Sequence, residues 1–413
     1  MKAKRISVLA FIVLLGASCD RSEPFVGGIA GADTEAFKVY ASGEADLSKG
    51  LPKTCILPQE PETKTTSVPM NALASQLLEY GNRGKVLELS GTYRSADVRT
   101  GEPITLSGKV LLPKGRKPLR YIVVSHYTIG ANSEAPSNVF PLEGVLCDLG
   151  YAMIFPDYQG YGVDRKNIHP YLVMSQTAFD VVNMYKAVAK YLEHTAYKPE
   201  YDDIYLMGFS QGGAVTMSTQ WMMESILGMG DQIHQVFAGG GPYDVRATFN
   251  NFVETNSVNI APAVPFVIQG MIKRYGANAD MSKVLQPWIY EKMDEWINSK
   301  DYSVNQLRDM MATTRTSDIL TAEAMDRTSD LVAELYKAMT ENSILAQDWT
   351  PRAPVYMMHS MDDDVVPFVN AAKAKDQWTE ANIQYNFGHY GSHMKSALRF
   401  IYSVQTWLKR EDE

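Results

Sequence analysis

Short apolar segments that look like buried strands alternate with helix-like segments through much of the chain. The strand-like segments are 121–125, 152–156, 204–208, 235–239, 355–359 and 383–387. Segments 175–192, 212–227, 368–379 and 392–409 instead carry apolar residues at the three- and four-residue spacing of an amphipathic helix. Strands that are joined by helices run parallel and are covered on both faces. The alternation therefore predicts an α/β fold with a mostly parallel central sheet and helices on both faces.

Two further parts of the chain modify this simple alternation. Segments 86–93 and 104–113 alternate apolar and polar residues and end at turns, which predicts an antiparallel pair at the start of the sheet. Strand-like segments are missing from 242 to 349, where helix-like segments occupy 282–298, 304–313 and 321–342. Open α/β sheets bind ligands at the carboxyl ends of their strands. We therefore expect a core formed by 61–245 and 350–413, with 246–349 as a helical cap over the strand ends.

The N-terminus has the order of residues that is typical of an export signal. Lys2, Lys4 and Arg5 precede the apolar segment 6–15, which is too short to span a membrane, and small residues at 16–18 lead to Cys19. We predict a signal peptide over 1–18. Because the next residue is cysteine, the segment resembles a bacterial lipoprotein signal, which implies that Cys19 is acylated. An ordinary cleaved signal with an incidental cysteine is the alternative.

Residues 19–60 mix glycine, serine, proline and charged residues with little periodicity. This composition predicts a tether without regular structure between a lipid anchor and the folded body. The lipoprotein resemblance then implies an exported protein that is anchored to a membrane, on the periplasmic or the cell-surface side. Membrane contact is expected through the N-terminal lipid.

Charge and cysteine content exclude several classes of protein. The 39 Lys and Arg residues are outnumbered by 47 Asp and Glu residues, and basic residues cluster only in the first five positions, so nucleic acid is not an expected partner. Three cysteines are too few for a disulfide scaffold or a four-cysteine zinc site. Cys55 and Cys147 could pair after export, or Cys147 could be a small buried core residue, and the sequence leaves both open.

A reactive serine is indicated by Gly-x-Ser-x-Gly at 208–212, between a predicted strand and a predicted helix. Such a turn exposes the hydroxyl of Ser210, which needs a base and then an acid that orients the base. The acid is expected at Asp363, which follows the strand-like segment 355–359 and stands four residues before Pro367. Asp362 and Asp364 are the adjacent alternatives.

The base is expected at His393, at the entrance of the last predicted helix, with His389 as the alternative. The same two histidines could instead form a metal pair, but Gly391 interrupts their helical spacing and no metal site is predicted. The negative oxygen of an acyl-transfer intermediate needs two backbone N–H donors. These donors are expected from Gln211, which follows the serine, and from Tyr127, in the loop after segment 121–125.

With these residues placed, the chain resembles the α/β-hydrolase superfamily and, within it, the secretory lipase branch of serine esterases and lipases. The closer match is carried by 126–130, 135–137, 150–162 and the His-Pro-Tyr-Leu sequence at 169–172. The resemblance implies an α/β-hydrolase fold with a helical lid, ester hydrolysis, and neither a metal nor an organic cofactor. It also implies structural roles for Asp157 and His169, which would tie the loop after segment 152–156.

Three classes of function are compatible with the sequence. The first is a serine carboxylester hydrolase that cleaves a small-molecule or lipid ester through an acyl-enzyme. The second is an exopeptidase on the same scaffold, because esters and amides share a tetrahedral intermediate. The third is a surface lipoprotein that binds a ligand without catalysis. Since binding alone needs no serine, aspartate and histidine in this order, the first class is favoured.

Overall fold

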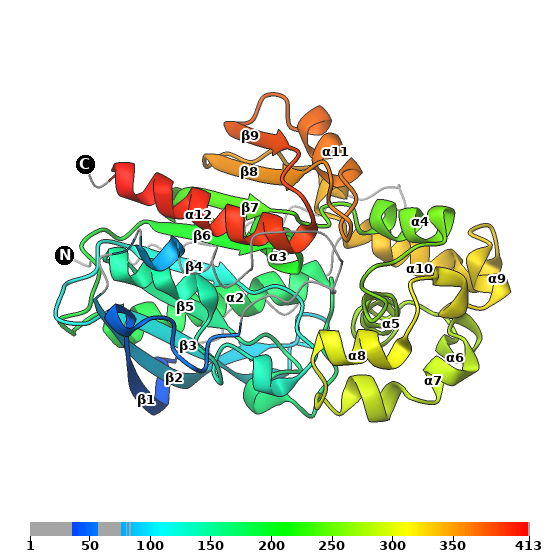
Figure 1. Ribbon diagram of the computed structural model, residues 1–413, viewed down its shortest axis with the longest axis horizontal. Helices are drawn as coiled ribbons and strands as arrows, with labels where there is room; N and C mark the ends of the chain where they lie inside the picture. Colours follow the sequence, from blue (N-terminus) through cyan, green and yellow to red (C-terminus); the bar gives the residue numbers. More distant parts are fainter. Residues whose placement is uncertain (1–34, 57–75, 80, 82–83, 412–413) are drawn as a thin grey trace, which may run out of the picture.

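The structure is a computed structural model, and it describes residues 35–56, 76–79, 81 and 84–411. In this part of the chain, nine strands form one sheet in the order β1-β2-β3-β5-β4-β6-β7-β8-β9 (Figure 1). From β5 to β9 every neighbouring pair is parallel, whereas β1, β2, β3 and β5 pair antiparallel. The strands are β1 (Lys38–Asp46), β2 (Lys85–Ala96), β3 (Pro103–Pro113), β4 (Tyr121–Ser125), β5 (Ala152–Pro156), β6 (Ile204–Phe209), β7 (Ile233–Gly239), β8 (Val355–Ser360) and β9 (Ile383–Gly388). The predicted α/β class and mostly parallel sheet are confirmed.

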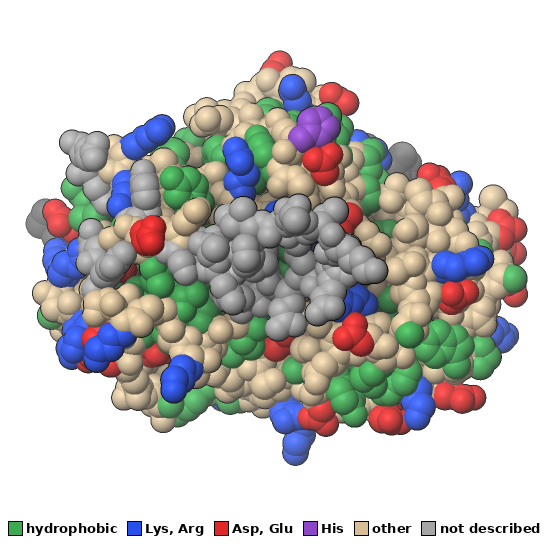
Figure 2. All heavy atoms as spheres, in the orientation of Figure 1, with side chains coloured by type: hydrophobic (Ala, Val, Ile, Leu, Met, Phe, Trp, Pro, Cys, Tyr) green, Lys and Arg blue, Asp and Glu red, His purple; other side chains and the backbone are tan. Residues whose placement is uncertain are grey.

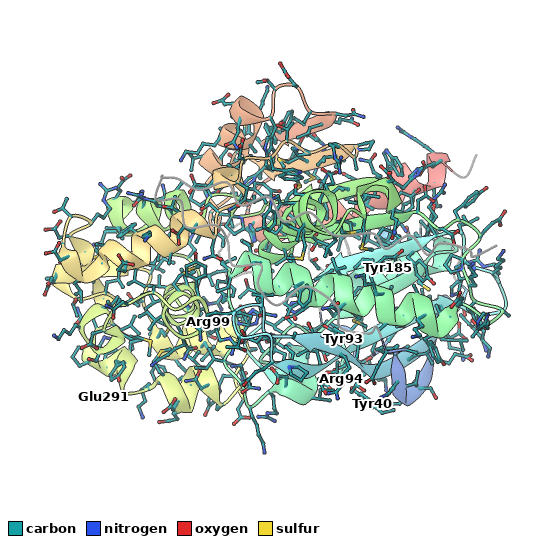
Figure 3. All side chains as sticks on the ribbon, turned by 180° about the vertical axis from the view of Figure 1, so that it is seen from behind. Tyr40, Tyr93, Arg94, Arg99, Tyr185 and Glu291 are labelled. Atoms are coloured by element: carbon teal, nitrogen blue, oxygen red, sulfur yellow. The ribbon has the colours of Figure 1, made fainter. Side chains whose placement is uncertain are left out.

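Helices cover both faces of the sheet. On one face lie α2 (Met174–Leu192) and α3 (Gln211–Trp221), and on the other lie the 3₁₀ helix η3 (Leu142–Leu149) and the last helix, α12 (His393–Glu411). Successive residues of a strand point to opposite faces, so Leu206 packs in the α2 and α3 core while Met207 packs in the α12 and η3 core. Seen from behind (Figure 3), α2 crosses the sheet, where Tyr185 meets Tyr121 of β4 edge-on with ring centroids 5.8 Å apart.

The first strand, β1, lies in a segment that was predicted to have no regular structure. Residues 19–60 were expected to form a tether without regular structure, but Lys38–Asp46 pairs antiparallel with β2. This strand lies at the edge of the sheet and Ala45 is its one buried residue, so backbone hydrogen bonds hold it and its side chains show no apolar alternation. The predicted signal peptide, Cys19 and the remaining tether residues 19–34 and 57–60 lie outside the described residues.

An insertion of helices separates β7 from β8 and lies at one end of the sheet (Figure 1). It contains α4 (Val245–Thr255), α5 (Ala263–Gln269), η7 (Gly270–Tyr275), α6 (Met281–Val284), α7 (Pro287–Tyr290), η8 (Met293–Asn298), α8 (Val304–Met311), α9 (Ala322–Met325) and α10 (Asp330–Glu341). The helix expected at 321–342 is broken between α9 and α10. There Asp326 accepts a hydrogen bond from the N–H of Thr328, and Ser329 caps α10. Likewise, 282–298 forms three short helices, with Pro287 at the start of α7.

The remaining expectations concern cysteine pairing, membrane-spanning helices and surface charge. Cys55 and Cys147 are both free thiols, and Cys147 is fully buried in η3. No helix within the described residues has the length and apolar character needed to cross a bilayer. On the face drawn in Figure 2, basic and acidic side chains are interspersed.

Candidate active site

The chain turns sharply from β6 into α3 at Ser210. Ser210 has φ 60°, in the left-handed region that non-glycine residues rarely occupy, and its N–H donates to the carbonyl of Gly239 at 2.9 Å. The flanking glycines are required by close packing. A Cβ on Gly212 would lie 2.0 Å from the carbonyl oxygen of Ser125, and a Cβ on Gly208 would lie 2.3 Å from that of Gly212. The tight turn therefore holds Ser210 in one orientation at the end of β6.

Ser210, His393 and Asp363 are joined by hydrogen bonds. His393 Nε2 lies 2.8 Å from Ser210 Oγ, and His393 Nδ1 lies 2.7 Å from Asp363 Oδ2. An ionised carboxylate can only accept, so Nδ1 carries the imidazole proton and Nε2 accepts from the serine hydroxyl. The structure brings together the three residues that were predicted as nucleophile, base and acid, and all three are buried.

The carboxylate of Asp363 is stabilised by donors on two sides. Burial by itself raises the pKa of Asp363, but the charge and hydrogen bond of His393 and smaller contributions from other donors hold it below its usual value. Two of those donors are the N–H groups of Val365 and Val366, at 3.0 and 2.8 Å from Oδ1. His359 lies behind the carboxylate, with Nε2 3.6 Å from Oδ2 and 3.0 Å from the carbonyl of Val366. Asp363 is thus kept ionised, so that it can hold the imidazole.

The alternative residues have other partners. Asp362 pairs with Nδ1 of His389 at 2.8 Å, and both side chains are exposed. Asp364 accepts the backbone N–H of His393 at 2.9 Å through Oδ1 and so fixes the first residue of α12. Across the described ranges, no group of three His, Cys, Asp or Glu side chains is arranged to hold a metal ion.

The backbone N–H groups of Tyr127 and Gln211 were expected to bind the negative oxygen of the intermediate. Within the described residues, the backbone N–H groups of Tyr127 and Gln211 have no hydrogen-bond acceptor. The side chain of Gln211 is fixed because Nε2 donates to His169 Nε2 at 2.8 Å, while His169 Nδ1 donates to the carbonyl of Gln159 at 2.8 Å. Burial lowers the pKa of His169 far below its usual value, which keeps the ring neutral and able to accept.

Asp157 is also buried and lies away from Ser210. Its Oδ2 accepts from the hydroxyl of Ser107 at 2.6 Å, and its Oδ1 accepts from the N–H of Ser137 at 2.8 Å. These contacts tie β3 to the segments around 137 and 157. Structural roles were expected for both Asp157 and His169, but the contact of His169 with Gln211 was not predicted. The two residues are far apart in the sequence, and no local pattern indicates their contact.

Two cavities open beside Ser210. The larger, about 200 Å³, is also lined by His393, Tyr127 and the carboxyl-bearing residues Glu134 and Glu143. The smaller, about 30 Å³, is lined by Gln211 and by apolar residues of α4 and α5. The sequence analysis missed Glu143, which lies in an apolar helix-like segment with no signal of a site. Ser210 lines both cavities, so space for a bound molecule adjoins this residue in two places.

The sheet order, the turn at Ser210 and the hydrogen-bonded serine, histidine and aspartate define a protein of the α/β-hydrolase class. Residues 140–410 match the model of the family described as secretory lipase, and the chain belongs to this family. This membership supports ester hydrolase activity and export. Sequence comparison with curated proteins gave no match.

Solved structures share the fold at low sequence identity. The cell wall degrading esterase LipA from Xanthomonas oryzae is 21% identical with a TM-score of 0.69, covering 81% of this chain and 92% of that one. A putative hydrolase from Legionella pneumophila is 18% identical with a TM-score of 0.68, covering 82% and 94%. Lipase A from Candida antarctica is 15% identical with a TM-score of 0.58, covering 86% and 77%.

Proposed function

We propose that the protein is a serine carboxylester hydrolase that works through an acyl-enzyme. Ser210 Oγ attacks the ester carbonyl, and His393 Nε2 takes the hydroxyl proton and passes it to the leaving alcohol. Water then attacks the acyl-enzyme by the same route and releases the acid. The observation that carries this proposal is the unbroken chain of hydrogen bonds from Ser210 through His393 to Asp363, at 2.8 and 2.7 Å.

Asp363 and two backbone amides complete the proposed mechanism. Asp363 holds the tautomer of His393 that leaves Nε2 free to accept, and its negative charge stabilises the imidazolium that forms during attack. The N–H groups of Tyr127 and Gln211 donate to the carbonyl oxygen as it becomes negative. Their lack of other acceptors within the described residues supports this role.

The insertion between β7 and β8 acts in this proposal as a cap on the core, with boundaries near 246 and 349. Side chains from α4, α5 and α8 line the cavities at Ser210, which supports a role in enclosing the substrate. The substrate is a small-molecule or lipid ester. We further propose that Cys19 carries lipid and holds the enzyme at a membrane surface.

The activity is tested with p-nitrophenyl esters of increasing acyl length beside aminoacyl-nitroanilides. We expect turnover of at least one ester, little turnover of the anilides, and loss of ester turnover in Ser210→Ala. Ser218→Ala, which removes a buried hydroxyl from the same helix, is the matched control and should remain active. Faster cleavage of the anilides would favour the exopeptidase. Ligand binding without turnover of any ester would favour a non-catalytic protein.

A further inference from the structure

The two cavities at Ser210 differ in size and in polarity. The smaller, about 30 Å³, is lined by apolar side chains that include Leu172, Phe249 and Phe252. The larger, about 200 Å³, contains both apolar side chains and several charged ones. Ser210 and Thr128 line both. An ester that is attacked by Ser210 has an acyl side and an alcohol side, so each side must occupy a different cavity.

The position of His393 indicates which cavity holds the alcohol side of the ester and which holds the acyl side. His393 lines the larger cavity and does not line the smaller one, which is lined instead by Gln211. In the proposed mechanism the imidazole gives its proton to the departing alcohol, so the alcohol oxygen must lie next to Nε2. The alcohol therefore extends into the larger cavity, and the acyl chain extends into the smaller one.

The smaller cavity limits the length of the acyl chain. A volume of about 10–15 Å³ on this measure holds one water-sized group, so about 30 Å³ holds two or three such groups. Phe249 and Phe252 of α4 are 4% and 7% exposed and line the cavity, with Val267 of α5 as another wall residue. A packed core does not open freely for longer chains. Acyl groups of a few carbons fit, and long fatty acyl groups do not.

The larger cavity is lined by a buried carboxyl group whose one partner among the described residues is its own backbone N–H. Glu143 is 8% exposed and lines the cavity, and no described residue other than Glu143 itself gives its carboxyl a hydrogen bond. A carboxyl group has lone pairs for several hydrogen bonds, so one backbone donor leaves it able to bind a ligand. Burial raises the pKa of Glu143, and its carboxyl oxygens can accept from a ligand hydroxyl. A ligand hydroxyl satisfies such a group.

Other residues beside Glu143 line the same cavity. Glu134 accepts the N–H groups of Gly130 and Ala131 through Oε2, each at 3.0 Å. Tyr127 lines the same cavity as Glu134 and Glu143, and burial, with a further contribution from these carboxyls, raises the pKa of its hydroxyl. Arg308, Lys395 and Asp364 also line the cavity, so charged side chains of both signs surround it. The wall suits a neutral molecule that bears hydroxyl groups.

We propose that the substrate is an ester between a short acyl group and an alcohol that carries further hydroxyl groups, with Glu143 binding one of those hydroxyls. The inference rests on the proposed function. In the balanced reaction, water adds across the bond between the acyl carbon and the alcohol oxygen, so that the short acid and the hydroxylated alcohol are released. Glu143 is a specificity residue and takes no part in proton transfer.

The proposed preference for short acyl groups, the acyl half of the proposal, is tested by kcat/KM for p-nitrophenyl acetate, butyrate and octanoate. We expect the wild type to prefer acetate or butyrate over octanoate by about tenfold or more, because the small apolar cavity has little room for added methylenes. Phe249→Leu should shift the preference toward octanoate. Phe179→Leu removes the same volume from the α2 core and should leave the preference unchanged. A wild type that prefers octanoate overturns the acyl half.

The alcohol half is tested with the glycerol monoester and the ethyl ester of butyric acid. We expect a kcat/KM ratio of about tenfold or more in favour of the glycerol ester. Glu143→Leu should abolish this ratio, and Glu143→Gln, which keeps donor and acceptor atoms, should largely retain it. A wild-type ratio near one overturns the hydroxyl assignment. So does a choline ester that is preferred over the glycerol ester.

These outcomes are separable from failure of the proposed function. If no ester is turned over, or if Ser210→Ala remains as active as the wild type, the proposed function itself is wrong. If esters are turned over through Ser210 but acyl length and alcohol hydroxyls make no difference, the mechanism stands and the substrate assignment fails.

Discussion

The side chain of Asp363 is fully buried, and its carboxylate orients His393. Replacing it by Asn keeps the size of the side chain but offers an N–H to the imidazole, which favours the wrong tautomer. We expect kcat to fall by about 10⁴-fold with little change in the far-ultraviolet circular dichroism. Asp362→Asn is the matched control, since Asp362 bonds exposed His389 and not His393. Equal losses in both variants would contradict the assignment of the acid.

A second buried carboxyl, Asp180 on α2, predicts how stability changes with pH. Its Oδ1 accepts from the hydroxyl of Ser95 at 2.7 Å and from Gln176 Nε2 at 3.0 Å. Burial raises the pKa of Asp180 from 3.8 to about 8. The folded state therefore holds this proton more tightly than the unfolded state, so the contribution to stability is complete below about pH 4 and declines up to about pH 8.

This prediction is tested by thermal unfolding between pH 5 and 8. The unfolding temperature of the wild type should fall more over this range than that of Asp180→Asn, because the variant carries no titratable group at this position. Parallel curves for the two proteins would show that Asp180 does not hold its proton in the folded state.

At the scale of elements, the turn between β6 and α3 requires glycine at position 212. Gly212→Ala would place a Cβ 2.0 Å from the carbonyl oxygen of Ser125. Since the atoms that this Cβ would meet belong to the backbone, α3 would have to move away from β4. We expect ester turnover to fall by about a hundredfold or more, and the unfolding temperature to fall as well, since overpacking costs about 1–3 kcal/mol.

Gly43→Ala in β1 is the control for this variant, because no atom lies within 4 Å of the added Cβ. Its turnover and unfolding temperature should match those of the wild type. An active, stable Gly212→Ala would show that the turn accommodates a side chain and that the account of its geometry is wrong.

Buried elements were predictable from the sequence, and exposed ones were less so. Strands such as β6 are buried on both faces, so their apolar runs indicate both the strand and its position in the sheet. The edge strand β1 has no such run and was expected to be unstructured. The helices of the insertion were predicted as a group, but their ends depend on local turns such as the one at Asp326.

The site residues that lie in a local motif, or at the start of a predicted helix, could be predicted from the sequence. Ser210 lies in a local motif, and His393 lies at the start of the last helix, so both were identified from the sequence. The choice of Asp363 over its neighbours depended on its spacing from Pro367. The contact of Gln211 with His169 joins residues 42 positions apart, and the buried carboxyl of Glu143 depends on packing. Neither leaves a pattern in the sequence.

At the scale of the whole molecule, the location of the enzyme is open to a direct test. If Cys19 carries acyl chains, each buried methylene contributes about 0.8 kcal/mol to membrane binding, and two or more chains anchor the protein stably. We expect the wild type to partition into a detergent phase. Cys19→Ser should enter the aqueous phase or remain an unprocessed precursor, whereas Cys55→Ser should behave as the wild type. An aqueous wild type whose mature N-terminus is not Cys19 would leave only ordinary secretion.

The central claim is that Ser210 becomes acylated, and covalent labelling tests it most directly. The intact protein is treated with a fluorophosphonate, which reacts with an activated serine, and the labelled peptide is identified by mass spectrometry. We predict one label per chain, on the peptide that contains Ser210, and no label in Ser210→Ala or in heat-denatured protein. A label on another residue, or ester turnover in Ser210→Ala within about tenfold of the wild type, would contradict the account.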